Sequence, residues 1–160
     1  MESEADVTRL KPHDGMGQVY LDANAEAVRC GDRKVSTEHV LLALLAPKGS
    51  PVARALGVSP DDGRAALERL DRAALSSVGI HAEAAGPVLP GRVEDRLPMT
   101  PAVKAVFTGL RKQAGRDRIG VHHVLLGLLA RTRPDPAAAL IDALGIDRSA
   151  VRAQLEREQR

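Results

Sequence analysis

An internal repeat constrains this chain more than any other feature. The segment Val35–Leu45 reads VSTEHVLLALL, and Ile119–Leu129, 84 residues later, reads IGVHHVLLGLL with most apolar positions kept. Further on, Ala55–Gly57 returns as Ala143–Gly145 at an offset of 88, so the second copy has four additional residues. These are most simply placed in the loop 131–135. Two copies of one small unit are therefore joined in a single chain.

The composition favours helices as the building element. A chain of 160 residues with 44% hydrophobic content can bury a core as one domain or as two small ones. Trp is absent, and Tyr20 and Phe107 are the only aromatic residues, so Leu, Val and Ala must fill that core. Small aliphatic side chains suit close helix packing better than a sandwich or barrel, and we expect an all-α fold.

Charge and cysteine content limit the compartment and the partners. The net charge is only +2 with both signs interspersed, which gives no strong field for nucleic acid or an anionic membrane. Cys30 is the single cysteine, so no intramolecular disulfide can form, and its place near a helix C-terminus predicts an inert thiol. The acidic start lacks an apolar stretch, and the run Val40–Ala46 is too short to cross a bilayer. We expect a soluble cytoplasmic protein.

Capping signals predict four helices in the first unit. The first covers about residues 14–30 and ends at Gly31, and Ser36 or Thr37 can cap the second. Ser50 and Ser59, each followed by proline, open the third and fourth. The predicted core positions of these helices are Val19, Tyr20, Ala23, Ala27, Val40, Leu41, Leu44, Leu45, Ala66, Leu67, Leu70 and Ala74.

The second unit carries the same signals. Thr100 opens a helix that Gly115 ends, with Val103, Val106, Phe107 and Leu110 facing inward, and Asp135 and Asp147 cap the last two helices. Residues 76–98, rich in Gly and Pro, are typical of a flexible linker. The expected organisation is a tail at 1–12, one repeat at 13–75, the linker, and a second repeat at 99–157, with both repeats in one domain.

The paired blocks resemble the repeat of the Clp N-terminal domain. The resemblance rests on Thr37–Leu45 with the following Ala55–Gly57, and on Met99–Pro101 with the second Leu block; it covers about residues 13 to 157. It implies two four-helix repeats related by a pseudo-twofold axis, acting as a non-enzymatic docking module for the substrates or adaptors of ClpA and ClpC unfoldases. No G-x-x-x-x-G-K-[ST] phosphate loop occurs, so the chain resembles a freestanding N-domain.

The resemblance also implies specific ligands. In ClpC relatives this domain can recognise phosphorylated arginine, in pockets that use a Thr at the start of the first helix and the Glu of the Thr-Glu-His block, and certain cyclic peptides bind it. Glu38 and Thr100 match that pattern. His13 or Asp14 stands where the first opening needs Thr, and His122 replaces the second Glu. Phosphoarginine is therefore expected to bind weakly or not at all.

The expected binding surface is a groove near the two helix starts. It would hold a peptide, an adaptor or a cyclic peptide through backbone N–H groups and a few side chains. The chain would then either deliver cargo to a Clp protease complex or act as a decoy for ligands of the unfoldase, and both roles stay open. The predicted binding residues are Thr37, Glu38, Met99, Thr100, Val103, Lys104, Phe107 and His122.

Neither catalysis nor a metal or other cofactor is expected. Thr37, Glu38 and His39 cannot form a relay among themselves, because adjacent helical side chains point about 100° apart. We expect Thr37 to cap the helix and His39 to be partly buried with a satisfied hydrogen bond. His122 and His123 diverge in the same way and have no ligand at the i+4 spacing of zinc-binding helices.

The alternative function is an Arg-rich helical regulator that binds nucleic acid. Arginine forks suit phosphates. However, an acidic residue interrupts the group and no aromatic side chain is available to stack on bases, so nucleic acid is the less favoured partner. The basic residues concerned are Arg111, Lys112, Arg116, Arg118, Arg131 and Arg133.

Overall fold

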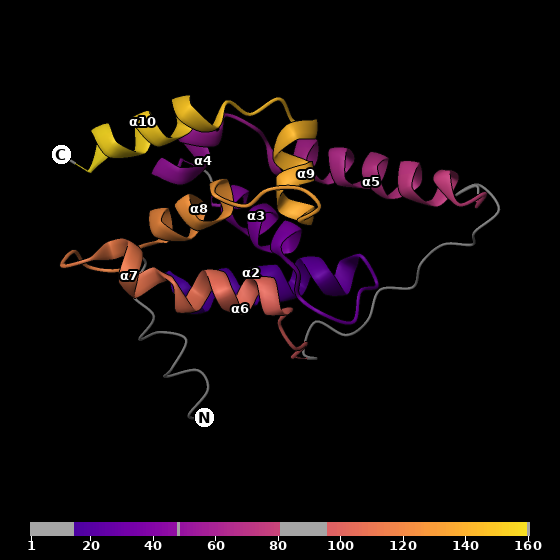
Figure 1. The fold of residues 1–160 in the computed structure, drawn as a ribbon, viewed down its shortest axis with the longest axis horizontal. Helices are drawn as coiled ribbons and strands as arrows, with labels where there is room; N and C mark the ends of the chain where they lie inside the picture. The colour runs from indigo at the N-terminus through magenta and orange to yellow at the C-terminus, as the bar shows by residue number, and fades with distance from the viewer. Residues whose placement is uncertain (1–14, 48, 81–95, 160) are drawn as a thin grey trace.

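The computed structural model describes residues 15–47, 49–80 and 96–159, and the regular structure in these ranges is helical (Figure 1). The all-α prediction is confirmed. None of the described helices combines the length and apolar character that crossing a membrane requires. The predicted tail and most of the predicted linker lie outside the described residues. The helices are α2 (Met16–Arg29), α3 (Thr37–Leu45), α4 (Pro51–Leu56), α5 (Pro60–Ser77), α6 (Pro101–Thr108), α7 (Leu110–Ala114), α8 (Val121–Leu129), α9 (Pro136–Ala143) and α10 (Arg148–Glu158).

The helix boundaries follow the capping residues. Helix α2 ends in a Schellman motif, in which the N–H of Gly31 donates to Val28 and the N–H of Asp32 donates to Ala27. Gly31 adopts a φ of +73°, a conformation that costs a residue with a Cβ more than it costs glycine. At the helix starts, side-chain oxygens accept hydrogen bonds from first-turn N–H groups, as predicted, at Ser50, Ser59, Thr100, Asp135 and Asp147.

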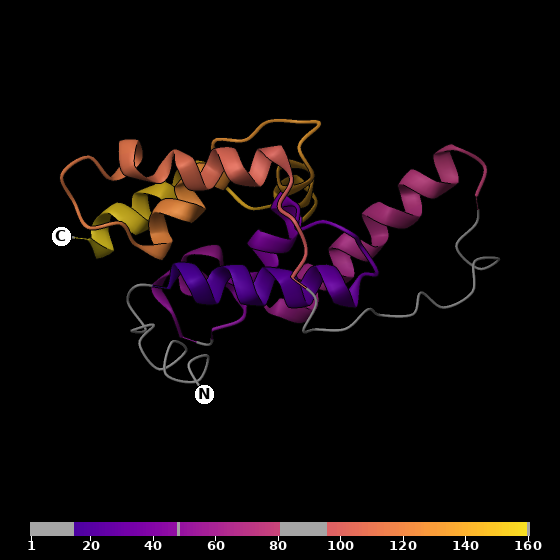
Figure 2. The same ribbon diagram turned by 90° about the horizontal axis from the view of Figure 1, so that it is seen from below.

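The two repeats correspond helix by helix and pack as one body. In chain order, α2 corresponds to α6 and α7, α3 to α8, α4 to α9, and α5 to α10. Helix α3 contacts α2, α4 and α5 of its own repeat and also α6, α8 and α9 of the other, while α10 packs on α4 (Figures 1 and 2). Leu41 and Leu125, at matching positions of the Leu blocks, are both fully buried. A single hydrophobic core therefore draws on both repeats.

The helix predicted over residues 100–115 is interrupted at Gly109. Helix α6 ends at Thr108 and α7 begins at Leu110. The Thr108 hydroxyl donates to the carbonyl of Ala105 at 3.2 Å, a side-chain bond that competes with regular helix geometry, and glycine is a weak helix former. The inward positions Val103, Val106 and Leu110 are buried as predicted, whereas Phe107 is only partly buried.

Helix α5 continues beyond the core. Its first half buries Gly63, Ala66 and Leu67, but Ala74, predicted to face inward, is exposed. Both views show the second half projecting away from the other helices (Figures 1 and 2), and α5 runs to Ser77, inside the predicted linker. The apolar pattern of α5 therefore continues past the last residue that packs against another described helix.

Candidate functional site

A short parallel bridge joins the starts of α3 and α6. The N–H of Val35 donates to the carbonyl of Pro98, and the N–H of Thr100 donates to the carbonyl of Val35, both at 2.9 Å. Thr100 and Glu38, the two residues that keep the Clp pattern, therefore belong to neighbouring helix starts contributed by different repeats. Within its own repeat, each of the two residues lacks the counterpart that the Clp pattern requires.

Two of the predicted binding residues are core residues instead. Thr37 is fully buried, where its hydroxyl donates to Asp135 at 2.7 Å and accepts from the N–H of Ala137 at 3.2 Å. It therefore caps α9 of the other repeat, while Ser36 is the residue at the α3 cap position. Val103 is 1% exposed within the hydrophobic core. Both side chains are therefore inaccessible in this structure, and Thr37 joins the two repeats.

The other predicted residues do not form one site. His122 lines the groove described below. Lys104 is exposed on α6, and the remaining predicted residues, Glu38, Met99, Thr100 and Phe107, are partly exposed outside the lining of that groove.

The histidine at the third position of α3 and of α8, His39 and His123, caps its own helix. Nδ1 of His39 accepts the N–H of Ser36 at 2.9 Å, and Nδ1 of His123 accepts the N–H of Gly120 at the same distance. Both rings are buried. A ring nitrogen that accepts cannot carry a proton, so each neutral ring holds its proton on Nε2. The prediction of a satisfied hydrogen bond for His39 is confirmed, whereas the ring is fully buried and not partly buried as predicted.

A trio of potential metal ligands gathers where α2 leads into α3. Ligand atoms of Cys30, Asp32 and His39 lie within 4.8 Å of one another. A metal on Nε2 of a neutral His39 would require a proton on Nδ1, and that proton would point at the Ser36 N–H. The helix cap therefore conflicts with metal binding, and the trio does not fit a metal site.

Carboxylates crowd the same region. Burial lowers the pKa of His39, but the hydrogen bond to Asp32 and the charge of Glu38 raise it, to about 9. The two carboxylates favour a second proton on the His39 ring, which would have to bind Nδ1. The hydrogen bond that Nδ1 accepts from the Ser36 N–H opposes this protonation. Burial and the same two carboxylates raise the pKa of Asp71. Since protonation would break the cap in a site that is 1% exposed, we expect His39 to remain neutral at pH 7.

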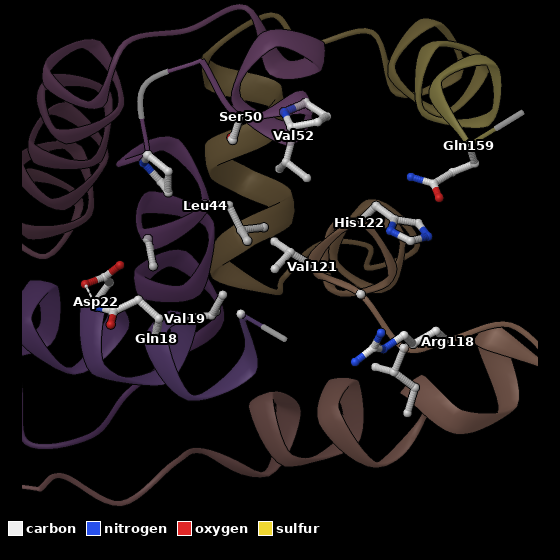
Figure 3. A pocket seen from close by; sticks show the side chains of 16 residues that line it. Gln18, Val19, Asp22, Leu44, Ser50, Val52, Arg118, Val121, His122 and Gln159 are labelled. Atoms are coloured by element: carbon white, nitrogen blue, oxygen red, sulfur yellow. Dashed lines mark hydrogen bonds between the residues drawn. The ribbon is translucent and has the colours of Figure 1, made fainter. Parts of the chain in front are cut away.

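A cavity of about 680 Å³ lies between the two repeats, and we call it the inter-repeat groove (Figure 3). Its walls are mainly apolar, with Val19, Leu44, Val52 and Val121 pointing into it. The lining residues are Gly15, Gln18, Val19, Asp22, Ala43, Leu44, Pro47, Ser50, Pro51, Val52, Arg118, Ile119, Gly120, Val121, His122 and Gln159.

The polar residues of the groove stand on opposite sides. Gln18 and Asp22 lie on one side, with the Gln18 amide donating to Asp22 at 2.8 Å, and Arg118 and His122 lie on the other (Figure 3). Burial raises the pKa of Asp22 despite that hydrogen bond. Burial and the neighbouring His123 lower the pKa of His122, which is therefore neutral at pH 7. The charged side chains of the groove lining are therefore one carboxylate, Asp22, on one side and one guanidinium, Arg118, on the other, with apolar side chains between them.

Helix starts contribute backbone donors to the groove. Gly15 precedes α2, and Gly120, Val121 and His122 form the start of α8. The N–H of Gly120 already donates to Nδ1 of His123. The first-turn N–H groups of Val121 and His122 have no acceptor within their own helix backbone, so they can serve an incoming carbonyl. The sequence did not predict the apolar lining of the groove, formed by Val19, Leu44, Val52 and Val121. These residues come from segments far apart in the chain, and no local pattern marks them.

Comparison with known proteins identifies the family. Residues 11–135 match the family described as the Clp repeat (R) N-terminal domain. The chain belongs to the Clp repeat N-terminal domain family. The resemblance seen in the sequence is thereby confirmed.

Relatives of this Clp N-domain are much longer proteins. Chaperone protein ClpC2 of the rice chloroplast is 30% identical over 147 residues, which cover 88% of this chain and 14% of that protein. A ClpA homolog, an ATP-binding subunit of the ATP-dependent Clp protease of Guillardia theta, is 31% identical over the same length and is covered to 16%. The chain thus spans about a seventh of these relatives.

A solved Clp N-domain has the same fold. The N-terminal domain of the caseinolytic protease associated chaperone ClpD from Arabidopsis thaliana superposes with a TM-score of 0.64. The match covers 89% of this chain and 93% of that one, at 20% sequence identity. This likeness shows the shared fold.

The arginines of this Clp N-domain do not form one continuous face. Arg118 lines the groove at the start of α8, whereas Arg131 and Arg133 follow its end. A helix of nine residues is about 13 Å long. The basic residues grouped in the sequence are therefore divided between opposite ends of a helix.

Proposed function

We propose that this chain is a non-enzymatic docking module that holds a peptide segment of a substrate or adaptor protein in the inter-repeat groove and so serves a Clp unfoldase. Membership in the Clp repeat family supports the connection to Clp. The matched relatives are named as a chaperone and as an ATP-binding subunit of the Clp protease. Because this chain spans only a small part of them, we assign it a docking role and none of their ATP-dependent activity.

The groove itself carries the proposal. Its volume of about 680 Å³ can enclose one large side chain and the backbone on either side of it. Burying an apolar side chain there is favourable by about 25 cal/mol per Å² removed from water. Asp22 on one side and Arg118 on the other fix the direction of a charged peptide. The favoured occupant is a segment with a large apolar residue between a basic and an acidic residue.

Calorimetry with short synthetic peptides tests the groove directly. The peptides carry a central Leu with Lys on one side and Glu on the other. Val121→Glu places a carboxylate at the groove wall, at the start of α8 where acidic residues are well tolerated. Val78→Glu makes the same change at a position 71% exposed and outside the groove.

We expect Val121→Glu to weaken binding about tenfold or more, the equivalent of a partly lost apolar contact, and Val78→Glu to leave it unchanged. Both variants are checked for an unaltered circular dichroism spectrum. Equal affinities for wild type and Val121→Glu would show that peptides bind elsewhere.

Reconstituted degradation tests the Clp connection. A Clp unfoldase and its protease are mixed with a fluorescent model substrate, with and without this chain. Faster degradation indicates an adaptor, slower degradation indicates a decoy, and either effect should disappear in Val121→Glu. An unchanged rate at saturating concentration would contradict a Clp-directed role.

A cyclic peptide that binds Clp N-domains should compete with the linear peptides if it uses the same groove.

The nucleic-acid alternative has less support, because its arginines are divided between the two ends of α8. It predicts a DNA mobility shift that weakens steeply as the salt concentration rises.

A further inference from the structure

The four additional residues of the second repeat help to form a second cavity. It has a volume of about 350 Å³ and lies where the loop after α8 meets the start of α10. The first repeat is shorter by four residues in the corresponding stretch. We call it the arginine cavity, and its lining residues are Leu129, Ala130, Arg131, Thr132, Arg133, Asp142, Arg148 and Arg152.

Positive charge exceeds negative charge around this cavity. Arg133 and Arg148 both donate to Asp142, at 3.1 and 3.0 Å, and Arg131 donates to Asp135 at 3.0 Å. The hydrogen bond from Arg133 and the charge of Arg148 lower the pKa of Asp142, so this carboxyl remains ionised. Among the lining residues and Asp135, two carboxylates therefore face four guanidinium groups.

Several arginine donors are not used by the protein. Nε of Arg148 has no hydrogen-bond partner within the described ranges, but this atom is buried and Nη2 donates to the carbonyl of Ala138 at 3.5 Å, so Arg148 contributes mainly its charge. The Arg133 guanidinium reaches Asp142 through Nε, and Arg152 makes no hydrogen bond or ion pair with the described residues. A guanidinium has five N–H donors, so the cavity combines excess charge with free donors. Asp142 holds two of the guanidinium groups in place before any ligand arrives.

We propose that the arginine cavity binds a phosphate monoester. A phosphate dianion matches the surplus of two positive charges, and its terminal oxygens accept paired hydrogen bonds from arginine forks. The phosphate belongs either to a small metabolite or to a phosphorylated protein side chain. A nucleic-acid strand fits less well, because no aromatic side chain lines the cavity to stack on its bases. This proposal does not depend on the inter-repeat groove.

Calorimetry with O-phosphoserine, a phosphoserine peptide and adenosine monophosphate tests the proposal. Arg133→Gln and Arg152→Gln each remove one charge from an exposed position of the cavity, so the fold should be retained. Arg72→Gln is the matched control: it removes the same charge from α5, where Arg72 pairs only with Glu68 on the surface. Thermal unfolding of each variant verifies the fold.

We expect Arg133→Gln and Arg152→Gln to weaken phosphate binding about tenfold, the equivalent of one charge-assisted hydrogen bond, and Arg72→Gln to have no effect. Stronger binding of the phosphoserine peptide than of adenosine monophosphate would assign the cavity to phosphorylated proteins, and the reverse order to small metabolites. Absence of binding by all three probes would overturn the proposal. So would equal weakening by the control, or binding of a single-stranded DNA oligonucleotide alone.

Discussion

The Thr37 hydroxyl donates a hydrogen bond to Oδ1 of Asp135 across 2.7 Å, and so joins the start of α3 to the start of α9 in the other repeat. The same hydroxyl accepts the N–H of Ala137, which also donates to Asp135. Arg131 donates to the second carboxylate oxygen of Asp135 at 3.0 Å. A threonine of the first Leu block therefore completes the N-terminal cap of a helix 98 positions away in the chain.

Replacing this hydroxyl should destabilise the whole fold. Thr37→Val keeps the shape but removes the donor to a buried carboxylate, so we expect the free energy of unfolding to fall by about 1–3 kcal/mol. Thr37→Ser keeps the hydroxyl and should lose less. Urea denaturation measures both variants, with Thr108→Val, on the exposed face of α6, as the control. A Thr37→Val protein as stable as wild type would show that the hydrogen bonds of the Thr37 hydroxyl make no net contribution to the free energy of unfolding.

Gly63 should not tolerate a side chain. A Cβ at this position would lie 2.8 Å from Cδ1 of Leu45 and 2.9 Å from Cδ2 of Leu42, because α5 crosses close over α3. Alanine is a better helix former by about 1 kcal/mol, but overpacking a core costs about 1–3 kcal/mol. We expect Gly63→Ala to lower the thermal midpoint. Combining it with Leu42→Val, which removes one of the two clashing carbons, should recover part of the loss; a purely additive double variant would contradict this explanation.

The Leu blocks should contribute alike to stability. Leu41 and Leu125 are both fully buried at equivalent positions. Truncating either to alanine should therefore cost about 2–5 kcal/mol, measured by chemical denaturation. Leu75→Ala, on the projecting part of α5, is the control and should cost much less. A small loss at one of the two block positions would mean that the repeats are not equivalent in the core.

The stability of the fold should report the protonation state of His39. If this ring were charged, it would stabilise the fold below its ordinary pKa of 6.5, and that contribution would disappear as the pH rises through about 9. We expect it to be neutral, because Nδ1 accepts the Ser36 N–H. The stability difference from His39→Gln, which keeps an acceptor for the cap but cannot titrate, should then stay constant between pH 7 and 10.

Nitrogen NMR would show Nδ1 unprotonated over the same range. The difference in free energy of unfolding between wild type and His39→Gln could instead fall by about 1.4 kcal/mol per pH unit above pH 7. That result would show that the carboxylates of Asp32 and Glu38 keep His39 protonated despite the hydrogen bond from Ser36.

The sequence by itself determined where the helices begin and end. Ser50, Ser59, Thr100, Asp135 and Asp147 act on N–H groups two or three residues away, and Gly31 acts within one turn. Interactions of such short range depend hardly at all on the rest of the fold. The Leu blocks likewise predicted their own burial, because a continuous apolar face must be covered.

The tertiary structure alone decided which residues meet. Thr37 looked like a local cap and a binding residue, but it is buried against α9, and Thr100 starts α6 beside the α3 start that carries Glu38. The apolar stripe of α5 continues through Ala74, although no described helix covers it there. The groove and the arginine cavity bring together residues from separate helices. Their positions depend on how two similar repeats interlock, and no periodicity within either repeat encodes that arrangement.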